Sequence, residues 1–420
     1  MKVLLLGSGG REHALALALS KGKALETLYI APGNPGTEGL GVNVKLDMGD
    51  FHMVEEFVLE NEISLIVVGP EAPLVAGIAD HFKKYDHIQV IGPSAEGAKL
   101  EGSKAFSKKF MQRHGIPTAG YFECDATNLQ QGIDYLRTMK SPYVLKADGL
   151  AAGKGVLIID DVAEAEDALT EMLNGMFGEA SATVVIEEFL SGIEFSVFAL
   201  TNGKQYVILP EAKDYKRIGE GDQGLNTGGM GAVSPVPFVD DAMKSKVIEK
   251  IVKPTVQGLA AENIDYQGFL FFGLINVNGE PFVIEYNCRM GDPETEVVFP
   301  RIASDVLEMM VACARHELDQ YTLEVNPQTA VTVMMVSGGY PGDYEKGKAI
   351  EIGDTGDCIV FHAGTRISDG QLVTSGGRVL SVTSFGSTID EAARKSYAAI
   401  DDIGFEGAYF RRDIGGDLGN

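Results

Sequence analysis

The sequence predicts a multidomain protein of mixed α/β and α+β class. A parallel α/β domain comes first, an α+β domain follows in the centre, and a small β-rich domain lies at the carboxyl end. The 420 residues exceed what one hydrophobic core usually organises. The first hundred residues alternate β-rich runs with helix-compatible segments, whereas later parts hold strands joined by short turns. Apolar residues make up 45% and charged residues 23%, which is typical of a globular protein.

The amino-terminal domain, residues 1–102, is predicted to contain a parallel sheet. Its β-rich runs span residues 3–6, 27–30, 65–68 and 89–91, and a helix is expected over 12–20. The runs end in glycine and proline, as at Gly7-Ser8-Gly9-Gly10 and Gly69-Pro70. Ligands collect at the carboxyl ends of strands in open parallel sheets. We therefore expect a binding edge there.

The central domain is predicted over residues 103–325. A helix is expected from Ser103 to His114, because Gly115 and Pro117 stop it. The expected strands span residues 143–146, 156–159, 184–189, 194–200, 268–275 and 281–287.

Two further segments complete the domain prediction. The glycine-rich residues 215–237 contain few apolar anchors, so we expect a long functional loop. Residues 326–420 combine short β-rich stretches with one helix, expected over 389–403, and are predicted to form the small carboxyl-terminal domain.

The net charge of −25 argues against large anionic partners. It makes the surface repel nucleic acid and anionic lipid, although a basic pocket or a divalent cation still permits a small nucleotide. The four cysteines include no C-x-x-C pair, which disfavours a zinc knuckle and fits a reducing cytosol. No stretch has the pattern of a signal peptide, a membrane span or a heptad repeat. We expect a cytoplasmic monomer that binds neither nucleic acid nor membrane.

The glycine-rich turn at residues 7–10 has the pattern of a phosphate site. It follows a strand and opens a helix, so backbone N–H groups can hold a phosphate, with Arg11 and His13 beside them. Glu12 stands where the dinucleotide motif G-x-G-x-x-G needs its third glycine, which excludes NAD. Alone, these glycines fit a tight turn without a ligand equally well.

Polar groups at two neighbouring strand ends favour a ligand at this turn. They belong to the segments Asn34-Pro35-Gly36-Thr37 and Gly69-Pro70-Glu71. These segments add neutral and acidic hydrogen-bonding groups to the phosphate site, and a phosphorylated sugar needs both kinds.

A second glycine-rich turn lies between Lys146 and Lys154 and can close over a triphosphate. It differs from a P-loop, because Gly149 and Gly153 enclose three residues instead of four and Gly155 replaces the Ser or Thr after the lysine. By itself the turn fits two solvated lysines on a hairpin equally well.

The last strand expected in the central domain carries a candidate metal site. Its alternation places Glu285 and Asn287 on one face and Ile284 and Tyr286 on the other. Magnesium prefers oxygen ligands and often takes only one or two from protein, so the pair fits a metal that bridges nucleotide phosphates. An acid and an amide on the wet face of an ordinary sheet have the same spacing. The dense charged turn at residues 289–296 favours the site.

Eight segments, in order, make the whole chain resemble the phosphoribosylamine-glycine ligases, also called glycinamide ribonucleotide synthetases, a family of the ATP-grasp superfamily. They begin at Gly7 (GSGGREHAL), Pro32 (PGNPGT), Val68 (VGPEAPL), Leu100 (LEGSKAFSK), Lys146 (KADGLAAGKGV), Asn226 (NTGGMGA), Glu285 (EYNCRMGDPETE) and Arg411 (RRDIG). The resemblance implies a ribose-phosphate-binding amino-terminal domain, a central ATP-grasp domain with a mobile subdomain at about residues 117–190, and a small carboxyl-terminal domain.

The resemblance also implies ATP and a divalent cation, Mg²⁺ or Mn²⁺, as cofactors. The implied nucleotide contacts are Lys104, Lys146 and Lys154 at the phosphates, Glu187 and Phe189 at the adenine, and Glu194 at the ribose. Glu285 and Asn287 become the metal ligands. The substrate-binding residues are then expected to be Gly9, Gly10, Arg11, Glu12, Asn34, Gly36, Thr37, Pro70, Glu71, Asn226, Thr227 and Gly228.

The family reaction joins glycine to 5-phosphoribosylamine in purine synthesis. Glycine attacks the γ-phosphate of ATP to give glycyl phosphate, and the amine then attacks the acyl carbon to give glycinamide ribonucleotide. The resemblance assigns Asp214, Lys216 and Arg217 to enclosing the substrate and the intermediate, which keeps water from the acyl phosphate. Arg289 and Asp292 are expected to bracket the carboxylate and ammonium of glycine. The alternative is that they only brace their turn.

Two other functions stay open. Another ligase of the superfamily would keep the lysine turn and the carboxylate strand but lack the amino-terminal GSGGREHA and PGNPGT segments together. A nucleotide-sensing module would need no second substrate pocket, and the charged turn argues against it. Tyr215, Leu225 and Met290 depart from the family pattern without removing a proposed ligand. Residues 268–275 lack the acid that many ATP-grasp enzymes use as a further metal ligand, so the number of metal ions stays open.

Overall fold

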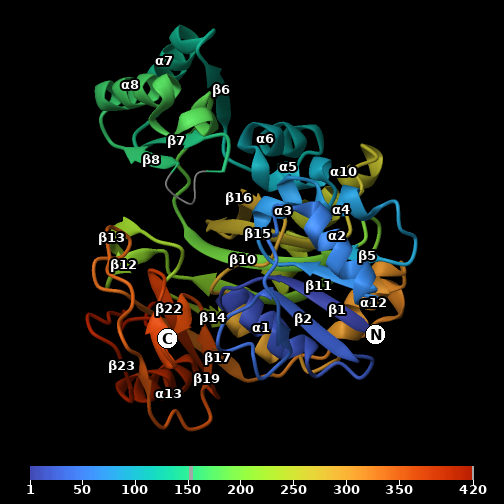
Figure 1. Cartoon of the computed structure of the whole chain (residues 1–420). Coiled ribbons are helices and arrows are strands. Elements are labelled where there is room, and N and C mark those ends of the chain that lie inside the picture. Colours follow the sequence, from blue (N-terminus) through green and yellow to red (C-terminus); the bar gives the residue numbers. More distant parts are fainter. Residues whose placement is uncertain (151–154, 419–420) are drawn as a thin grey trace.

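The computed structural model describes residues 1–150 and 155–418 of the chain (Figure 1). It begins with a five-stranded parallel sheet in the order β3-β2-β1-β4-β5. The strands are β1 (Lys2–Gly7), β2 (Thr27–Pro32), β3 (Val42–Asn43), β4 (Leu65–Val68) and β5 (Gln89–Ile91). The predicted parallel sheet is confirmed. Its order reverses between β1 and β4, where ligands bind outside the strand ends in sheets of this type.

Both faces of this sheet are covered. Leu4 and Leu6 pack with α2 (Phe51–Glu60) and α4 (Ile78–Phe82), whereas Val3 and Leu5 pack with α1 (Gly10–Leu19) and with α12 (Val306–Ala314). Burial on both faces explains the unbroken apolar run of β1, since parallel strands are shielded on both sides. The helices of this part are α1 (Gly10–Leu19), α2 (Phe51–Glu60), α3 (Glu71–Val75), α4 (Ile78–Phe82) and α5 (Ala95–Gly102).

A helix and a protruding lobe follow. Helix α6 (Lys104–Arg113) begins where the Ser103 hydroxyl accepts a bond from the Phe106 N–H at 3.1 Å, and it ends before Gly115, which has a φ of +64°. Residues 121–188 then form the lobe, a four-stranded antiparallel sheet in the order β6-β9-β7-β8. Its elements are β6 (Tyr121–Asp125), α7 (Leu129–Thr138), β7 (Tyr143–Ala147), β8 (Val156–Ile159), α8 (Val162–Glu171), η1 (Met172–Met176), η2 (Gly178–Ser181) and β9 (Thr183–Glu188).

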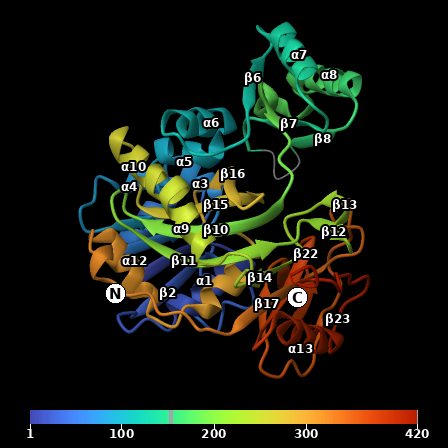
Figure 2. The ribbon, with the colours of Figure 1, turned by 180° about the vertical axis from the view of Figure 1, so that it is seen from behind.

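The lobe has a hydrophobic core of its own. Cys124, Leu136, Leu145 and Leu169 belong to a buried cluster that is confined to the lobe. Figures 1 and 2 show the lobe standing apart from the rest of the molecule, beyond α6 and β16 (Glu280–Asn287). A body with its own core can change position without losing its fold.

An eight-stranded antiparallel sheet forms the centre of the molecule, in the order β16-β15-β10-β11-β14-β17-β22-β19. Its strands are β10 (Ile193–Thr201), β11 (Tyr206–Asp214), β14 (Gly231–Ser234), β15 (Gly268–Val277), β16 (Glu280–Asn287), β17 (Thr329–Val336), β19 (Ile359–His362) and β22 (Arg378–Gly386). Residues from the predicted small carboxyl-terminal domain therefore continue the central sheet through backbone pairing between β14 and β17. Helices α9 (Asp241–Val247) and α10 (Lys253–Ala261), joined by η3 (Ile248–Val252), share a core with β15 and β16.

The expectation of a long loop over residues 215–237 is wrong. The segment contains a hairpin of β12 (Arg217–Gly219) and β13 (Gln223–Asn226), and then β14. The buried side chain of Arg411 pairs with Asp222 at 2.8 Å and donates to the Arg217 carbonyl at 3.0 Å. Ion pairs with the distant carboxyl end therefore order a segment that has few apolar anchors.

The carboxyl-terminal part packs on the far end of the large sheet. Helix α13 (Ile389–Asp401) ends before the predicted residue 403, because β23 (Ile403–Gly404) pairs with β18 (Glu351–Ile352). The remaining elements are α11 (Thr295–Val298), η4 (Phe299–Arg301), η5 (Leu318–Gln320), β20 (Thr365–Ser368) and β21 (Gln371–Thr374). None of the helices within residues 1–150 and 155–418 is long and apolar enough to cross a membrane.

The buried His13 and the partly buried His362 join the amino-terminal domain to the carboxyl-terminal part of the chain. The His362 N–H donates to Nδ1 of His13 at 2.9 Å, and Asn34 donates to the His362 carbonyl at 2.8 Å. A Cβ on Gly36 would lie 2.2 Å from His13, so glycine is needed for this approach. Burial lowers the pKa of His13 to about 3 and that of His362 to about 4. His13 therefore accepts a hydrogen bond as a neutral ring, instead of helping to hold a phosphate.

This contact predicts acid sensitivity. The pKa of His13 is lower in the folded state than the unfolded value near 6.5, so the unfolded state binds more protons between pH 6.5 and 3. Stability is complete above that window and falls with pH inside it, by about 2 kcal/mol from His13 alone at pH 5. The variant His13→Asn keeps an acceptor but does not titrate. Urea unfolding should show that it loses about 2 kcal/mol less than the wild type between pH 7 and 5; equal losses would contradict the assignment.

Candidate active site

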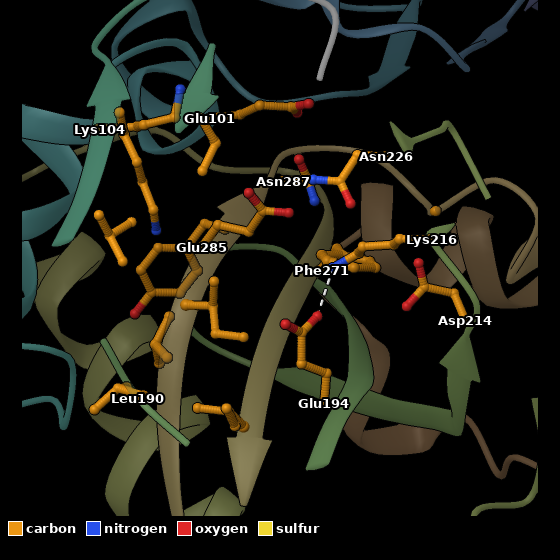
Figure 3. Close-up of a pocket in the computed structure, with 18 of the residues that line it drawn as sticks. Glu101, Lys104, Leu190, Glu194, Asp214, Lys216, Asn226, Phe271, Glu285 and Asn287 are labelled. Carbon is orange, nitrogen blue, oxygen red and sulfur yellow. Dashed lines mark hydrogen bonds and ion pairs between the residues drawn. The ribbon is translucent and has the colours of Figure 1, made fainter. Parts of the chain in front are cut away.

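A cleft of about 890 Å³ lies where the lobe, the large sheet and the edge of the parallel sheet meet (Figure 3). It brings together most of the predicted site residues, although they come from distant parts of the chain. Those that line it are Arg11, Glu71, Lys104, Lys146, Glu187, Phe189, Glu194, Asp214, Lys216, Asn226, Thr227, Gly228, Glu285, Asn287, Arg289 and Asp292.

The predicted residues of the glycine turn lie mainly behind the cleft wall. The Glu12 carboxylate fills the space beneath Gly7 and Gly69, where an added Cβ would meet it within 2.3 Å. It accepts the Gly9 N–H at 2.6 Å and pairs with Arg11 at 2.6 Å. Glu12 therefore holds the turn and orients Arg11 toward the cleft. Three other predicted residues near this turn, Gly9, Gly10 and Pro70, do not line the cleft.

Three more predicted residues serve the loop after β2. The Asn34 side chain donates to the carbonyls of Ser8 and His362, both at 2.8 Å. The Thr37 hydroxyl donates to the Asn34 carbonyl at 2.8 Å, and Gly36 packs against His13. This loop braces the glycine turn from behind. Lys154, another predicted site residue, lies outside the described residues.

Strand β16 presents the predicted metal ligands. Phe271 and Gly273 of β15 stand opposite Asn287 and Glu285, so β15 adds no acid beside them. Figure 3 shows Glu285 and Asn287 together in the cleft. No lysine or arginine in the described part of the chain pairs with the Glu285 carboxylate within 4.0 Å. Two oxygen donors that are not committed to an ion pair fit a divalent cation that takes its other ligands from phosphates and water.

The predicted strict alternation on β16 is broken at one point. A β-bulge leaves Ile284 without a partner on β15, so Val283 and Tyr286 both enter the core although they are three residues apart. Ile284 therefore lines the cleft beside Glu285, instead of facing away from it as predicted. A bulge adds one residue to a strand and re-aims the side chains near it.

Two lysines neutralise a buried carboxylate on the lobe side of the cleft. Glu187 lies 2.9 Å from Nζ of Lys108 and 3.1 Å from Nζ of Lys146. Burial by itself raises the pKa of Glu187, but the two lysines outweigh it and lower the pKa. Burial lowers the pKa of Lys108 to about 8 and also lowers the pKa of Lys104, whose Nζ is 3.4 Å from the Gly149 carbonyl. The cluster gives an acidic protein a local cationic surface for phosphate.

A second charged group lies at the end of β11. Lys216 pairs with Glu194 at 2.8 Å, and Asp214 lies beside them (Figure 3). The positive charge of Lys216 lowers the pKa of Glu194, whereas burial raises the pKa of Asp214. Asp214 is therefore the carboxyl of this group that takes up a proton most readily.

Two arginines fix the charged turn after β16. Arg289 pairs with the buried Glu101 at 2.8 Å and with the partly exposed Glu71 at 3.3 Å. Arg378 of β22 pairs with Asp292 at 2.9 Å and donates to the Gly228 carbonyl at 2.6 Å. Both arginines thus hold this turn against other elements. A substrate carboxylate can reach Arg289 only in competition with two protein carboxylates.

Sequence reasoning missed several cleft residues. Lys108 had a signal, because it stands one helical turn after Lys104 on α6. Glu101 stands in the segment LEGSKAFSK but was not assigned. Glu294 stands in the charged turn at residues 289–296 but was not assigned, and Arg378 had no local signal, because its partner Asp292 is distant in the sequence.

Comparisons with known proteins agree with this geometry. Family models of phosphoribosylglycinamide synthetase match three stretches: the N domain at residues 1–101, the ATP-grasp (A) domain at 102–295 and the C domain at 330–417. A phosphoribosylamine–glycine ligase of Escherichia coli O6:H1 is 46% identical over 423 residues, which cover 99% of this chain and 98% of that protein. One from Chlorobaculum tepidum is 47% identical over 425 residues, with 99% of each chain covered.

Solved structures give the same picture. The crystal structure of phosphoribosylamine–glycine ligase from Thermotoga maritima matches with a TM-score of 0.86 and 38% identity, covering 99% of this chain and 100% of that one. The biotin carboxylase domain of 2-oxoglutarate carboxylase from Hydrogenobacter thermophilus, solved with ADP, magnesium and bicarbonate, matches with a TM-score of 0.72 and 17% identity. It covers 97% of this chain and 91% of that one, and at this identity the likeness concerns the fold alone.

The buried cluster around Glu187 predicts that the loss of a buried lysine lowers the free energy of unfolding more than the loss of an exposed one. Lys108 and Glu187 are 2% and 4% exposed, so Lys108→Met leaves a buried carboxylate with one cation fewer. We expect the free energy of unfolding to fall by about 3 kcal/mol, the order found when a buried pair is broken. Lys109→Met is the matched control, because the neighbouring Lys109 is 52% exposed and pairs with Glu123 at the surface. Urea unfolding should show a loss below about 1 kcal/mol for the control. Equal losses would refute the special role of Lys108.

Proposed function

Because the chain belongs to the phosphoribosylglycinamide synthetase family, we propose that its cleft joins glycine to 5-phosphoribosylamine with the use of ATP. The protein is a carboxylate–amine ligase of purine biosynthesis. One observation carries the proposal for this cleft: Lys104 and Lys146 share it with the oxygen donors of Glu285 and Asn287. Cations for a triphosphate and ligands for its metal thus meet in one place.

The chain is proposed to work as three domains, at residues 1–102, 103–325 and 326–420. The first presents the parallel-sheet edge to a ribose phosphate. The second clamps ATP between the lobe and the large sheet, and the lobe, within about residues 117–190, moves to close over the nucleotide. Its separate hydrophobic core supports this motion.

ATP is proposed to lie between β9 of the lobe and β16 of the large sheet. Lys104, Lys146 and Lys154 then contact phosphates, and Glu187 and Phe189 contact adenine. Glu187 and Phe189 stand at the end of β9, where the lobe joins the large sheet, and both line the cleft. Glu194 binds the ribose hydroxyls, for which its carboxylate is a suitable acceptor.

Glu285 and Asn287 are proposed to hold a divalent cation, Mg²⁺ or Mn²⁺. When bound, such a cation neutralises negative charge that develops on the transferred phosphate. The two side chains orient the cation from β16. Lys104 lies close to them, since the negative charge of Glu285 acts on the pKa of Lys104. This protein supplies position and charge, and its residues need form no covalent intermediate.

The substrates are proposed to occupy the other end of the cleft. Phosphoribosylamine binds at the edge of the parallel sheet, through Gly9, Gly10, Arg11 and Glu12 of the glycine turn and through Asn34, Gly36, Thr37, Pro70 and Glu71. Of these, Arg11 and Glu71 line the cleft, and the others hold the turns that position them.

Glycine is proposed to bind between Arg289 and Asp292, whose charges match its carboxylate and ammonium. Asp214, Lys216, Asn226, Thr227 and Gly228 enclose the intermediate. Thr227 supports this placement, because its hydroxyl donates to the Lys216 carbonyl at 2.8 Å and fixes the hairpin over the cleft.

The proposed reaction has two steps. A glycine carboxylate oxygen attacks the γ-phosphorus, and the bond to the ADP oxygen breaks. The amine nitrogen of phosphoribosylamine then attacks the carbonyl carbon of glycyl phosphate, and phosphate leaves with the electron pair of the C–O bond. Each step depends on alignment and on neutralised charge, both of which a closed cleft supplies.

The decisive assay measures ADP and mass-detected product from ATP, magnesium, glycine and freshly generated 5-phosphoribosylamine. ADP that requires both substrates and accompanies glycinamide ribonucleotide supports the proposal. ADP with a different acid or amine would instead indicate another ligase of the superfamily. No ADP with any acceptor would indicate a nucleotide-binding module.

Removal of one metal ligand should abolish turnover without unfolding the protein. We expect Glu285→Ala to reduce kcat at least about 100-fold, because the phosphate charge loses the oriented cation. Glu280→Ala is a matched control on the same strand, since Glu280 pairs with Lys246 and Lys250 away from the cleft. The control should turn over normally. A folded Glu285→Ala enzyme with normal turnover would rule out the metal assignment.

Loss of a phosphate-contacting lysine should weaken nucleotide binding. A hydrogen bond to a charged group contributes about 1.5–3 kcal/mol, so Lys146→Met should raise the Kd of ATP by about 10- to 100-fold in calorimetric titration. Lys108 continues to neutralise Glu187 in this variant. Lys140→Met, an exposed lysine before β7, is the control and should bind like the wild type. An unchanged Kd in Lys146→Met would show that Lys146 does not contact the phosphates and serves only the structure.

A further inference from the structure

Formation of the amide releases a proton, and the cleft needs a group that accepts it. As the amine nitrogen of phosphoribosylamine bonds to the acyl carbon, it must lose one proton to become an amide nitrogen. Unpaired carboxylates are the natural acceptors in this cleft, because a carboxylate held by a lysine or an arginine is a weak base. This inference rests on the proposed function.

Ion pairs occupy most acids of the cleft. Seven cleft carboxylates pair with a lysine or an arginine at 3.3 Å or less: Glu71, Glu101, Glu187, Glu194, Asp222, Asp292 and Asp417. Of the other acids that line it in the described part of the chain, Glu285 is assigned to the metal, and Glu188 is exposed at the far, nucleotide end. Asp214 and Glu294 remain.

Glu294 places a buried carboxyl group at the cleft. Its side chain lines the cleft but is almost fully shielded from solvent. One carboxylate oxygen accepts the Ser196 hydroxyl at 3.3 Å. A Cβ on Gly291 would lie 2.4 Å from the other oxygen, so glycine leaves the space that this carboxylate occupies.

The position of Glu294 joins the two substrate ends. Glu294 directly precedes α11, which packs against both α1 and β11. Helix α1 follows the glycine turn proposed for the ribose phosphate, and β11 ends at Asp214, beside Lys216. A carboxyl at this junction lies where the amine and the acyl phosphate must meet.

The neighbouring charges favour a shared proton. Burial and the negative charge of Asp214 raise the pKa of Glu294 to about 8, and Lys216 and Arg289 oppose that shift only in part. Glu296 on α11 and Arg378 on β22 are the other charged groups close to it. Two carboxyls that repel each other are not easily ionised together, so one of them can hold a proton while the other keeps a basic oxygen.

We propose that Glu294, paired with Asp214, is the catalytic base that takes the amine proton of phosphoribosylamine during attack on glycyl phosphate. The N–C bond forms, the acyl C–O bond breaks, phosphate departs with its electron pair, and the proton moves to the carboxyl pair. ATP has already supplied the leaving group, so no further reactant is required.

The test separates the second step from the first. The variant Glu294→Gln is assayed with ATP, magnesium, glycine, phosphoribosylamine and hydroxylamine, which captures acyl phosphates as hydroxamates without help from an enzyme base. We expect glycinamide ribonucleotide per ADP to fall at least about 100-fold, within the range for loss of a general base, while ADP formation continues and glycine hydroxamate replaces the product. Asp214→Asn should shift the ratio in the same direction, and Glu324→Gln, an exposed acid outside the cleft, should keep the wild-type ratio.

Other outcomes overturn the inference. If product and ADP fall together in Glu294→Gln, the residue serves folding or glycine binding and is not the base. If the ratio of product to ADP stays within threefold of the wild type, another group takes the proton. Failure of the proposed function itself looks different, because the wild-type enzyme would then make no glycinamide ribonucleotide.

Discussion

Charge pairing inside the cleft is the constraint on which the rest of the structure depends. A buried charge without a partner costs several kcal/mol, so most of the buried lysines, arginines and carboxylates of the cleft pair with an opposite charge. The partners come from separate elements: Lys108 on α6 meets Glu187 on β9, and Arg378 on β22 meets Asp292 after β16. The same pairs that avoid this cost thereby fix the lobe, the large sheet and the carboxyl-terminal strands around one space.

This arrangement explains how a protein of net charge −25 can bind an anionic nucleotide. The overall field repels phosphate, but Lys104, Lys108 and Lys146 gather at one end of the cleft, and Glu187 neutralises them only in part. A local cationic surface in a partly enclosed cleft has more effect than distant surface charges, which solvent and salt screen. The local charge of the cleft, and not the net charge of the protein, therefore determines whether an anionic nucleotide binds there.

The hydrophobic cores are shared unequally between the parts of the molecule. The parallel sheet and the large sheet share two hydrophobic cores, so Leu4 and Phe272 belong to one cluster and Val3 and Phe271 to another. The lobe has a separate core and meets the rest through α6, β9 and their ion pairs. The proposed closure over a nucleotide would therefore change polar contacts at the cleft and leave both apolar cores intact.

The sequence alone determined the features that local patterns encode. Strand runs, the end of α6 before Gly115 and the glycine turn were predictable because each depends on residues close to one another in the sequence. The pairing of Glu285 with Asn287 followed from strand alternation, yet the bulge at Ile284 did not, since it depends on how β16 meets β15. Only the tertiary structure decided that Arg411 orders the hairpin, that Arg378 holds the charged turn and that no lysine or arginine within residues 1–150 and 155–418 pairs with Glu294. These facts are statements about distance in space between residues far apart in the sequence, and no local pattern records that distance.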